Sequence, residues 1–388
     1  VAAIAWETAW ALPAASQETD WPMWRHDAGH TAVSSHELPP SLHLAWTRRY
    51  SPRTPVWDDP LNQDLMPYDA IFEPVAAEGR IFIGFNDRDK VVAFDARSGR
   101  EQWRFYADGP VRFSPVFFRG KVYFTSDDGH LYCVDASHGR LQWRFRGAPA
   151  GNKVIGNRRV ISAWPARGGS VERDGTIYFA ASIWPFMGTF VYALDAGSGA
   201  VRWVNDAMGS DYVKQPHAAP AFAGVAPQGQ LAATKDLLLV RGGRSLPAVL
   251  DRHTGRLRYF NFGAKGEGGS FVAADEARMF VHTRVRGTTA LNLADGSNAK
   301  FRVNEPVLAE GITYTANAPG RSRDGQPAPG VVQAFDSGKR LLWQVEADGT
   351  GDLIKAGRRL YAAGETGLVA IDPPEADRPA RIAWSKAV

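Results

Sequence analysis

The sequence is poor in three features that would each point to a particular class of protein. It has one cysteine, Cys133, among 388 residues, which excludes an intramolecular disulfide and any site built on two cysteines. No apolar run is long enough to span a membrane. The formal net charge is only +4, and the basic residues are scattered rather than clustered as in a nucleic-acid-binding tail. We therefore expect neither a membrane span nor a nucleic-acid partner.

The chain is instead rich in aromatic residues and turn formers. It contains 13 Trp and 20 Phe beside 39 Gly and 25 Pro, and its hydrophobic fraction of 44% is ample for a packed core. Many aromatics together with many turn formers favour an all-β protein of short strands.

A motif of Asp, then Gly, then Trp recurs along the chain. It first reads "VVAFDARSGREQW" at residues 91–103 and returns, with decay, to the end of the sequence. An eighth aromatic strand, "LHLAWTRRY" with Trp46, precedes the first copy. The seven copies are Asp95/Gly99/Trp103, Asp135/Gly139/Trp143, Asp195/Gly199/Trp203, Asp251/Gly255/Tyr259, Asn292/Gly296/Phe301, Asp336/Gly338/Trp343 and Asp372/Trp384.

The repeat predicts an all-β propeller of seven or eight four-stranded blades. Each copy follows an apolar strand, a Gly-type turn and a second strand, so each unit supplies four short strands that pack on the next unit. The Asp and Gly suit a tight turn, and the Trp offers an apolar face to the neighbouring blade. We expect one propeller domain over residues 21–388. It has either seven blades and an extra strand at Trp46, or an eighth blade completed by sequence outside this chain, which would then be a fragment of a longer protein.

Units such as "VYALDAGSGAVRW" resemble the PQQ-like, or quinoprotein-type, β-propeller repeat from about residue 40 to residue 388. The segments "AWPARGGSV" and "ASIWPFMGTFVYALDA" are similar to an uncharacterised branch of large exported bacterial multidomain proteins. The resemblance implies this fold, but such proteins include both dehydrogenases and catalytically silent scaffolds. It also implies a periplasmic or secreted bacterial protein, with residues 1–20 as a signal-peptide remnant or a disordered N-terminus.

The spacing between copies of the motif locates a candidate ligand site. Successive Asp or Asn positions are 40, 60, 56, 41, 44 and 36 residues apart, so two units carry long loops within residues 160–245. Extra residues in a propeller fall in loops at the ring faces, where ligand sites form. Arginines with Trp and Gln suit an anionic or sugar-like ligand, although the Trp side chains could equally pack the loops and the arginines pair with local acids. The candidate ligand residues are Arg112, Trp164, Arg167, Trp184, His217, Gln228, Arg241 and Arg244.

Two enzymatic alternatives stay open beside a binding role. The resemblance implies that a quinone-dependent dehydrogenase would hold PQQ with Ca²⁺, yet acidic residues near the predicted inner strands, Asp69, Glu73 and Asp352, occur singly. A lyase acting on acidic polysaccharide could use His217, Tyr212 and Arg167 to move a proton beside a carboxylate. We favour a non-catalytic binding or scaffolding propeller without a cofactor or metal, which contacts other domains or proteins through its faces.

Overall fold

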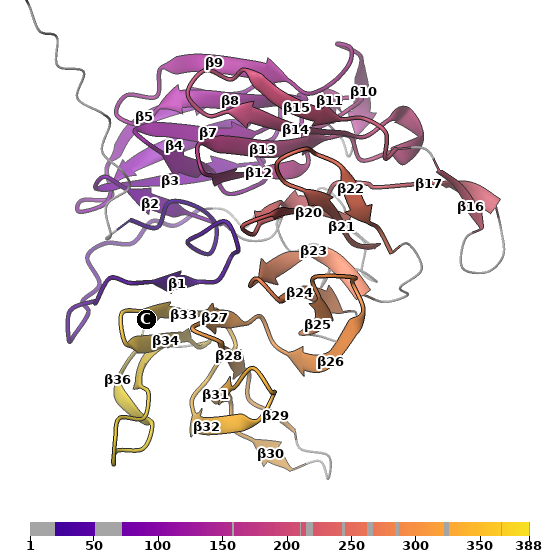
Figure 1. The fold of residues 1–388 in the computed structure, drawn as a ribbon. Helices are drawn as coiled ribbons and strands as arrows, with labels where there is room; N and C mark the ends of the chain where they lie inside the picture. The colour runs from indigo at the N-terminus through magenta and orange to yellow at the C-terminus, as the bar shows by residue number, and fades with distance from the viewer. Residues whose placement is uncertain are drawn as a thin grey trace, which may run out of the picture.

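The computed structural model describes the chain as a ring of β-sheets (Figure 1). The described residues are 20–50, 72–156, 159–209, 211–214, 220–242, 245–261, 267–283, 287–321, 326–365 and 367–387. Within them, seven antiparallel sheets follow one another around the ring, and each has four consecutive strands joined in a meander. This confirms the predicted propeller, and we number these sheets as blades 1–7 in chain order.

Blades 1–4 form the first part of the ring. Their strands, from the innermost to the outermost, are β2 (Val75–Ala77), β3 (Arg80–Phe85), β4 (Lys90–Asp95) and β5 (Glu101–Tyr106) in blade 1; β6 (Val116–Phe118), β7 (Lys121–Thr125), β8 (His130–Asp135) and β9 (Leu141–Arg146) in blade 2; β12 (Gly168–Arg173), β13 (Thr176–Ala181), β14 (Phe190–Asp195) and β15 (Val201–Asn205) in blade 3; and β19 (Ala232–Ala233), β20 (Leu237–Gly242), β21 (Ser245–Asp251) and β22 (Leu257–Tyr259) in blade 4.

Blades 5–7 continue the ring toward the C-terminal end. Their strands are β23 (Glu267–Ala274), β24 (Arg278–Thr283), β25 (Thr288–Asn292) and β26 (Asn298–Val303) in blade 5; β27 (Val307–Ala309), β28 (Ile312–Asn317), β31 (Val331–Phe335) and β32 (Leu341–Glu346) in blade 6; and β33 (Leu353–Ala356), β34 (Arg359–Ala363), β35 (Gly367–Asp372) and β36 (Arg381–Ala387) in blade 7.

The remaining elements are additions to this ring. Two short strands extend blades in parallel: β1 pairs with β33, and β18 pairs with β12. Three hairpins and one short 3-10 helix come from the loops. The added elements are β1 (Val33–Ser34), β18 (Gly229–Gln230), the hairpins β10 (Lys153–Gly156) with β11 (Arg159–Ser162), β16 (Asp211–Lys214) with β17 (Pro220–Ala223) and β29 (Gly320–Arg321) with β30 (Pro327–Ala328), and η3 (Pro185–Met187).

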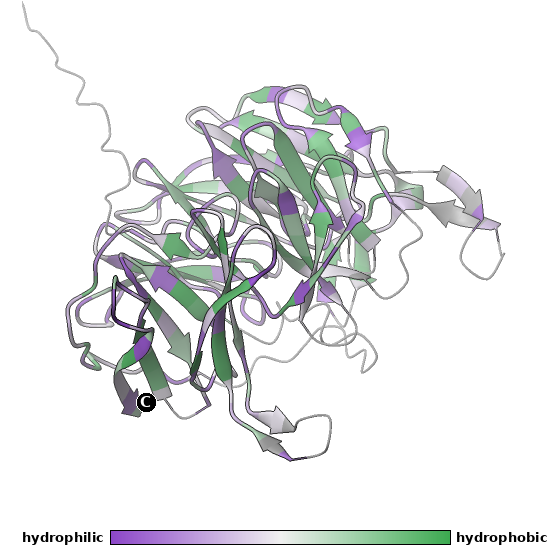
Figure 2. Ribbon diagram, turned by 60° about the horizontal axis from the view of Figure 1, so that its bottom comes forward, coloured by the Kyte–Doolittle hydropathy of each residue, from purple (hydrophilic) through white to green (hydrophobic). Residues whose placement is uncertain are grey.

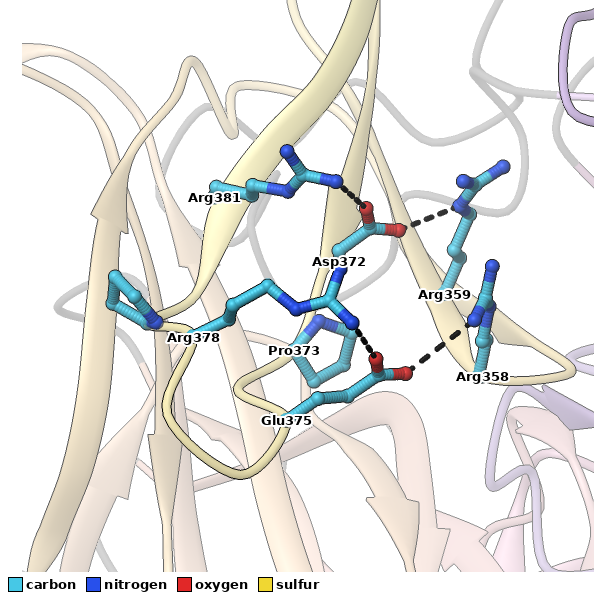
Figure 3. A pocket seen from close by; sticks show the side chains of 8 residues that line it. Arg358, Arg359, Asp372, Pro373, Glu375, Arg378 and Arg381 are labelled. Carbon is cyan, nitrogen blue, oxygen red and sulfur yellow. Dashed lines mark hydrogen bonds and ion pairs between the residues drawn. The ribbon is translucent and has the colours of Figure 1, made fainter.

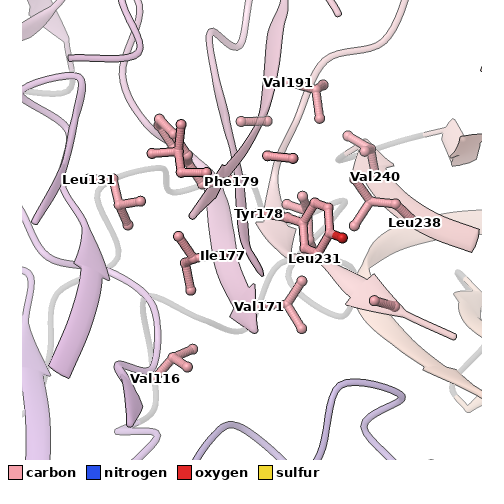
Figure 4. Close-up of a cluster of buried hydrophobic side chains, with 14 of the residues drawn as sticks. Val116, Leu131, Val171, Ile177, Tyr178, Phe179, Val191, Leu231, Leu238 and Val240 are labelled. Atoms are coloured by element: carbon pink, nitrogen blue, oxygen red, sulfur yellow. The ribbon is translucent and has the colours of Figure 1, made fainter. Parts of the chain in front are cut away.

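The core lies between successive blades. Figure 2 shows hydrophobic residues concentrated in the strands of the blades, and buried apolar side chains of successive blades pack against one another. The largest cluster joins blades 2, 3 and 4 through side chains such as Val116, Ile177, Tyr178 and Leu238 (Figure 4). A strand with two buried faces reads as a nearly continuous apolar run, which explains "VVAF" in β4 and "IYFAA" in β13.

The repeat motif forms both the outer turn of its own blade and the contact with the preceding blade. In blade 1, Asp95 Oδ1 accepts hydrogen bonds from the backbone N–H and the hydroxyl of Ser98, both at 2.7 Å. Gly99 follows with a φ of +66° and lies under the ring of Trp46. The Trp46 indole N–H donates to the carbonyl of Ala96 at 2.9 Å. The motif is therefore structural, as the turn chemistry predicts.

The same contact, which we call the junction contact, recurs around the propeller: an aromatic side chain packs on a turn glycine and donates a hydrogen bond to a turn carbonyl. In each case the aromatic side chain comes from the preceding outer strand. At blade 5 a tyrosine hydroxyl replaces the indole N–H. The donor, acceptor and distance are Trp46 to Ala96 at 2.9 Å, Trp103 to Ala136 at 2.9 Å, Trp143 to Gly197 at 3.3 Å, Trp203 to Arg252 at 2.9 Å and Tyr259 to Leu293 at 2.7 Å.

Replacing Gly139 by Ala is expected to destabilise the fold through this contact. A Cβ at Gly139 would lie 2.5 Å from the Trp103 ring, and its φ is +70°. Gly120 has the same backbone, with φ +71°, but a Cβ there would meet nothing within 4 Å. Gly120→Ala should therefore cost only the backbone penalty of about 1–2 kcal/mol, and Gly139→Ala about 1–3 kcal/mol more. Urea unfolding of both variants measures the difference, and equal losses would contradict the proposed role of the ring contact.

Candidate functional site

The N-terminal segment, residues 20–34, crosses the centre of the ring, and we call it the hub. Its backbone forms hydrogen bonds with the innermost strands of six of the seven described blades, and Met23 packs in the core cluster that includes blade 3. Because these strands surround the channel, a segment bonded to nearly all of them lies across it. The bonds pair Trp21 with Ala76, Pro22 with Phe117, Ala28 with Ala233, Gly29 with Ala274, Thr31 with Leu308 and Ala32 with Lys355.

Side chains of the hub hold it in place and contribute to the channel wall. Arg25 donates from Nε to the carbonyl of His30 at 3.1 Å and from an Nη to that of Pro306 at 2.5 Å. His30 is buried, its Nδ1 lies 2.9 Å from the carbonyl of Val272, and burial lowers its pKa well below the ordinary value. Its ring packs edge-on against Trp24. His30 is therefore a structural residue of the hub.

Beneath the hub lies a set of ionisable side chains from several blades, which we call the channel cluster. Arg25 belongs to the hub, Arg241 to β20 and His282 to β24, and the acids come from segments beside the innermost strands of blades 1, 6 and 7. Members of the cluster line two cavities, of about 40 Å³ and about 360 Å³. The members are Arg25, Glu73, Arg241, His282, Glu305 and Asp352.

Opposite charges balance one another within the channel cluster. His282 Nε2 lies 2.8 Å from Glu305 Oε1, and an Arg25 Nη lies 4.0 Å from Glu305 Oε2. Burial acts to raise the pKa of Glu305, but His282, Arg25 and Arg241 together hold it below the ordinary value. Burial raises the pKa of Asp352, and Arg25 only partly offsets this. The cluster can thus hold charge in the channel without a bound ion.

Arg241 is the most deeply buried charged side chain in the described part of the protein. It has no exposed surface, its Nε donates to the carbonyl of Gln230, and its guanidinium lies 5.3 Å from the centre of the Trp24 ring. Burial lowers the pKa of Arg241, while the charges of Glu73 and Glu305 act in the opposite direction. Its position under the hub makes Arg241 part of the channel interior rather than of an exposed loop.

Two of the predicted ligand-binding arginines converge, but they do so on a carboxylate. Arg112, before β6, donates from Nε to Asp127 Oδ2 at 2.7 Å. Arg167, before β12, donates to Asp127 from Nε and from an Nη, both at 3.0 Å. All three side chains are buried. Burial acts to raise the pKa of Asp127, but the two guanidinium charges hold it below the ordinary value. The arginines of this part of the predicted site therefore form a buried ion-pair triad.

The other predicted site residues are spread over several places. Trp164 is half-buried and donates to the carbonyl of Met187 at 2.8 Å, and half-buried Trp184 precedes η3. The backbone N–H of Gln228 donates to the carbonyl of Arg241 at 2.9 Å. Tyr212 is exposed on β16, in a hairpin that projects from the ring (Figure 1), whereas Arg167 is buried. His217, Arg244 and Asp69 lie outside the described residues.

Sequence reasoning missed a cavity of about 720 Å³ that opens on blades 5 and 6. Polar side chains including Arg302, Asn304 and Gln333 line it, and so do His282 and Glu305 of the channel cluster. These blades have motif spacings close to the average, so loop length carries no signal for this cavity. Only the position of His282 near the end of an inner strand could have indicated it.

A smaller concave surface lies on the final turn of blade 7 (Figure 3). Here Asp372 pairs with Arg359 at 2.7 Å and with Arg381 at 3.4 Å. Glu375 pairs with Arg358 at 3.4 Å and with Arg378 at 3.6 Å. Exposed ion pairs of this kind contribute little to stability. They replace the Asp–Gly turn of the other blades and leave these arginines paired, so the surface is not a strong anion site.

Metal-binding and membrane-spanning features are not found within the part of the chain that the structure describes. There, no three His, Cys, Asp or Glu side chains gather closely enough to hold a metal ion. The same residues contain no helix with the length and apolar character needed to cross a membrane.

Asp127→Asn should destabilise the protein strongly, because it leaves Arg112 and Arg167 buried with no counter-charge. We expect a loss of about 3–5 kcal/mol in the free energy of unfolding at neutral pH. The control Asp87→Asn removes an exposed pair with Arg88 and should cost under about 1 kcal/mol. The pKa of Asp127 is lower in the folded protein than in the unfolded chain. The difference in unfolding free energy between wild type and Asp127→Asn should therefore shrink as the pH falls below about 4. Thermal unfolding across this range tests both points, and a small, pH-independent loss would refute them.

Comparisons with known proteins agree with this architecture. The chain is 27% identical over 163 residues to tetrathionate hydrolase of Acidithiobacillus ferrooxidans, a match covering 42% of this chain and 30% of that protein. It is 25% identical over 215 residues to polyvinylalcohol dehydrogenase of a Pseudomonas species, covering 45% and 33%. The matches thus span about a third of the length of these curated relatives.

Solved structures share the fold at low sequence identity. A europium-containing methanol dehydrogenase superposes with a TM-score of 0.60 at 12% identity, over 96% of this chain and 86% of that one. The quinohemoprotein alcohol dehydrogenase from Comamonas testosteroni gives a TM-score of 0.59 at 14% identity, over 96% and 74%. Identities this low show a common fold alone.

The family assignment comes from a model described as outer membrane protein assembly factor BamB. It matches residues 14–203 and 187–299, which together make up about three quarters of the chain. The matched stretches contain the hub and blades 1–4 and most of blade 5. The chain therefore belongs to this BamB-type family of PQQ-like β-propellers.

Proposed function

We propose that this propeller is a non-catalytic scaffold that binds another protein through elements projecting from the ring. The observation that carries the proposal is the hub. It crosses the channel, and its backbone is bonded to the innermost strands of six blades. A channel closed in this way favours recognition by the outer surfaces.

The long loops flanking blade 3 offer a surface suited to a protein partner. Large apolar side chains stand exposed on β10, β11, η3 and β16: Ile155 is 84% exposed, Val160 59%, Phe186 61% and Tyr212 65%. We call these four residues the insertion surface. All four belong to segments that interrupt the regular repeat, and β17 contacts η3. Exposed apolar residues gathered on insertions are typical of interaction sites.

The channel does not fit the cofactor that the dehydrogenase relatives imply. PQQ is a planar, tricyclic polyanion and needs cationic partners. The cavities beside the hub are instead lined by the carboxylates Glu73, Glu305 and Asp352. The arginines Arg112 and Arg167 are already paired with Asp127. We therefore derive no reaction through PQQ for the described channel.

Two further predictions remain part of this proposal. A small anionic or sugar-like ligand would have to use the loops beside Trp164 and Trp184, since the nearby buried arginines are occupied by Asp127. A location in the periplasm or outside the cell is supported by the family description, which refers to the assembly of outer membrane proteins. The lyase alternative gains no support from the described residues, because Arg167 is buried and paired with Asp127 whereas Tyr212 is exposed on β16.

Site-specific photo-crosslinking tests the scaffold function. A photoreactive amino acid at 155, 186 or 212 should capture one and the same protein in cells of the source organism. The control position 341, on the outer strand of blade 6, is also exposed but lies outside the insertion surface. A triple variant, Ile155→Ser, Phe186→Ser and Tyr212→Ser, should keep its melting temperature yet lose a complex reconstituted with the purified captured protein. Equal labelling at 341 would contradict the proposal.

The dehydrogenase alternative has its own assay. The purified protein is incubated with PQQ and Ca²⁺, and the visible spectrum and alcohol-dependent dye reduction are recorded. We expect neither a bound chromophore nor dye reduction. Turnover that depends on both additions would overturn the non-catalytic function.

A further inference from the structure

Two junctions of the propeller are filled by aromatic side chains. At each of them, two rings that are paired across the ladder of one blade meet a third ring from the outer strand of the preceding blade. The stacked pair has its ring centres 5.3 Å apart in both cases. The sets are Phe124, Tyr132 and Phe105 between blades 1 and 2, and Phe179, Tyr192 and Phe145 between blades 2 and 3.

The junction between blades 5 and 6 carries smaller or polar side chains at the equivalent positions. On blade 6, Thr315 of β28 pairs across the ladder with Gln333 of β31, where the other junctions have their stacked rings. On β26 of blade 5, Val303 follows the motif residue Phe301 by two positions, the place that Phe145 takes on blade 2. These three side chains line the cavity of about 720 Å³, which we call the blade 5–6 cleft. The cleft therefore exists because aromatic packing is missing at this junction.

The walls of the blade 5–6 cleft combine side-chain amides with an aromatic ring. Gln333 donates from its amide to Gln344 Oε1 at 3.1 Å, and Asn304 donates to the carbonyl of Ala316 at 2.8 Å. A side-chain amide has a second N–H and a carbonyl oxygen beyond one such bond. Phe335 lies two residues after Gln333, on the same face of β31, and also lines the cleft. Donors and acceptors thus lie close to an apolar surface.

The inner end of the blade 5–6 cleft is formed by His282 and Glu305. The Glu305 side chain is 32% exposed, so its carboxylate can be reached from the cleft. Burial acts to raise the pKa of Glu305, but His282, Arg25 and Arg241 hold that pKa below the ordinary value, so the group is ionised at neutral pH. His282 is buried, and its Nδ1 has no hydrogen-bond partner among the described residues. This end offers a charged acceptor to a hydroxyl group.

We infer that the blade 5–6 cleft binds an uncharged, hydroxyl-rich ligand such as a mono- or disaccharide. A hydroxyl group both donates and accepts hydrogen bonds, so it matches side-chain amides, which also do both. The Phe335 ring can pack on the apolar C–H face of a sugar. Glu305 accepts a hydrogen bond from a hydroxyl but repels a carboxylate. The volume of the cleft lies within the range of about 300–1,000 Å³ that is typical of small-ligand sites.

This inference goes beyond the proposed scaffold function and does not depend on it. No residue of the insertion surface lines the blade 5–6 cleft. Trp164 and Trp184, to which the predicted anionic or sugar-like ligand refers, do not line it either. The cleft opens between two blades, so the hub can close the channel and leave this site accessible.

Saturation-transfer difference NMR on the purified protein tests the inference. The probes are glucose, N-acetylglucosamine and cellobiose, with glucuronate as a charged counterpart of glucose. At least one uncharged sugar should bind with a dissociation constant of about 1 mM or lower. Glucuronate should not bind, because its carboxylate would face Glu305. No transfer to any uncharged sugar at about 10 mM would overturn the inference, and so would binding of glucuronate alone.

A double variant, Thr315→Phe with Gln333→Tyr, fills the blade 5–6 cleft. It copies the ring pair that blades 2 and 3 carry at the same ladder positions. Because the rings occupy an existing cavity, the variant should keep or raise the melting temperature, and it should lose sugar binding. Sugar binding that persists in this folded variant would place the ligand elsewhere and refute the site.

A conservative variant tests the amide without changing the volume of the side chain. Gln333→Leu should keep the melting temperature and weaken sugar binding about tenfold, since it removes hydrogen bonds to the ligand. The control Gln102→Leu removes an exposed amide on β5 and should leave binding unchanged. Equal effects of the two variants would contradict the role of Gln333. The triple variant of the insertion surface should bind the sugar as the wild type does, so either proposal can fail alone.

Discussion

The packing of one aromatic ring on the turn glycine of the next blade is the contact on which the structure depends. A four-stranded sheet with two apolar faces cannot be stable alone, because either face would be exposed to water. The aromatic side chain covers one face of the sheet. Its N–H or O–H donates a single hydrogen bond that fixes the distance and the angle to the next turn, as between Trp103 and Ala136. Because the contact involves a backbone carbonyl, the acceptor residue can vary. Ala, Gly, Arg and Leu all serve.

The same chemistry explains why the fold could be predicted and the hub could not. Asp, Gly and Trp act through local turn geometry and ring size, so their spacing alone indicates the architecture. The hub is bonded to the blades almost entirely through backbone groups, such as the carbonyls of Ala28 and Thr31. Backbone bonds of this kind leave no signature in the side chains. The blade count was predicted only as seven or eight, because Trp46 makes the contact of an outer strand without a described sheet of its own.

The candidate site shows a similar division. The convergence of Arg112 and Arg167 followed from their equivalent places before two innermost strands, and the structure places them together. Their partner, Asp127, lies in "SDDG", which reads as an ordinary hairpin turn. Which carboxylate of such a turn points inward depends on how one blade docks on the next. The channel cluster combines side chains from the hub and five blades for the same reason, and no local spacing links Arg25 with Glu305.

The hub and the junction contacts together determine which surfaces are available for binding. In a propeller with an open channel, the innermost strands provide the converging side chains that a small ligand requires. Here the hub occupies that position, and charges such as Arg241 and Glu305 compensate one another beneath it. Buried polar atoms without a hydrogen-bond partner nevertheless occur in the channel, at both Nη atoms of Arg241. The proposed binding of a protein partner therefore depends on the exposed apolar side chains of the insertion surface and not on the number of unpaired polar groups.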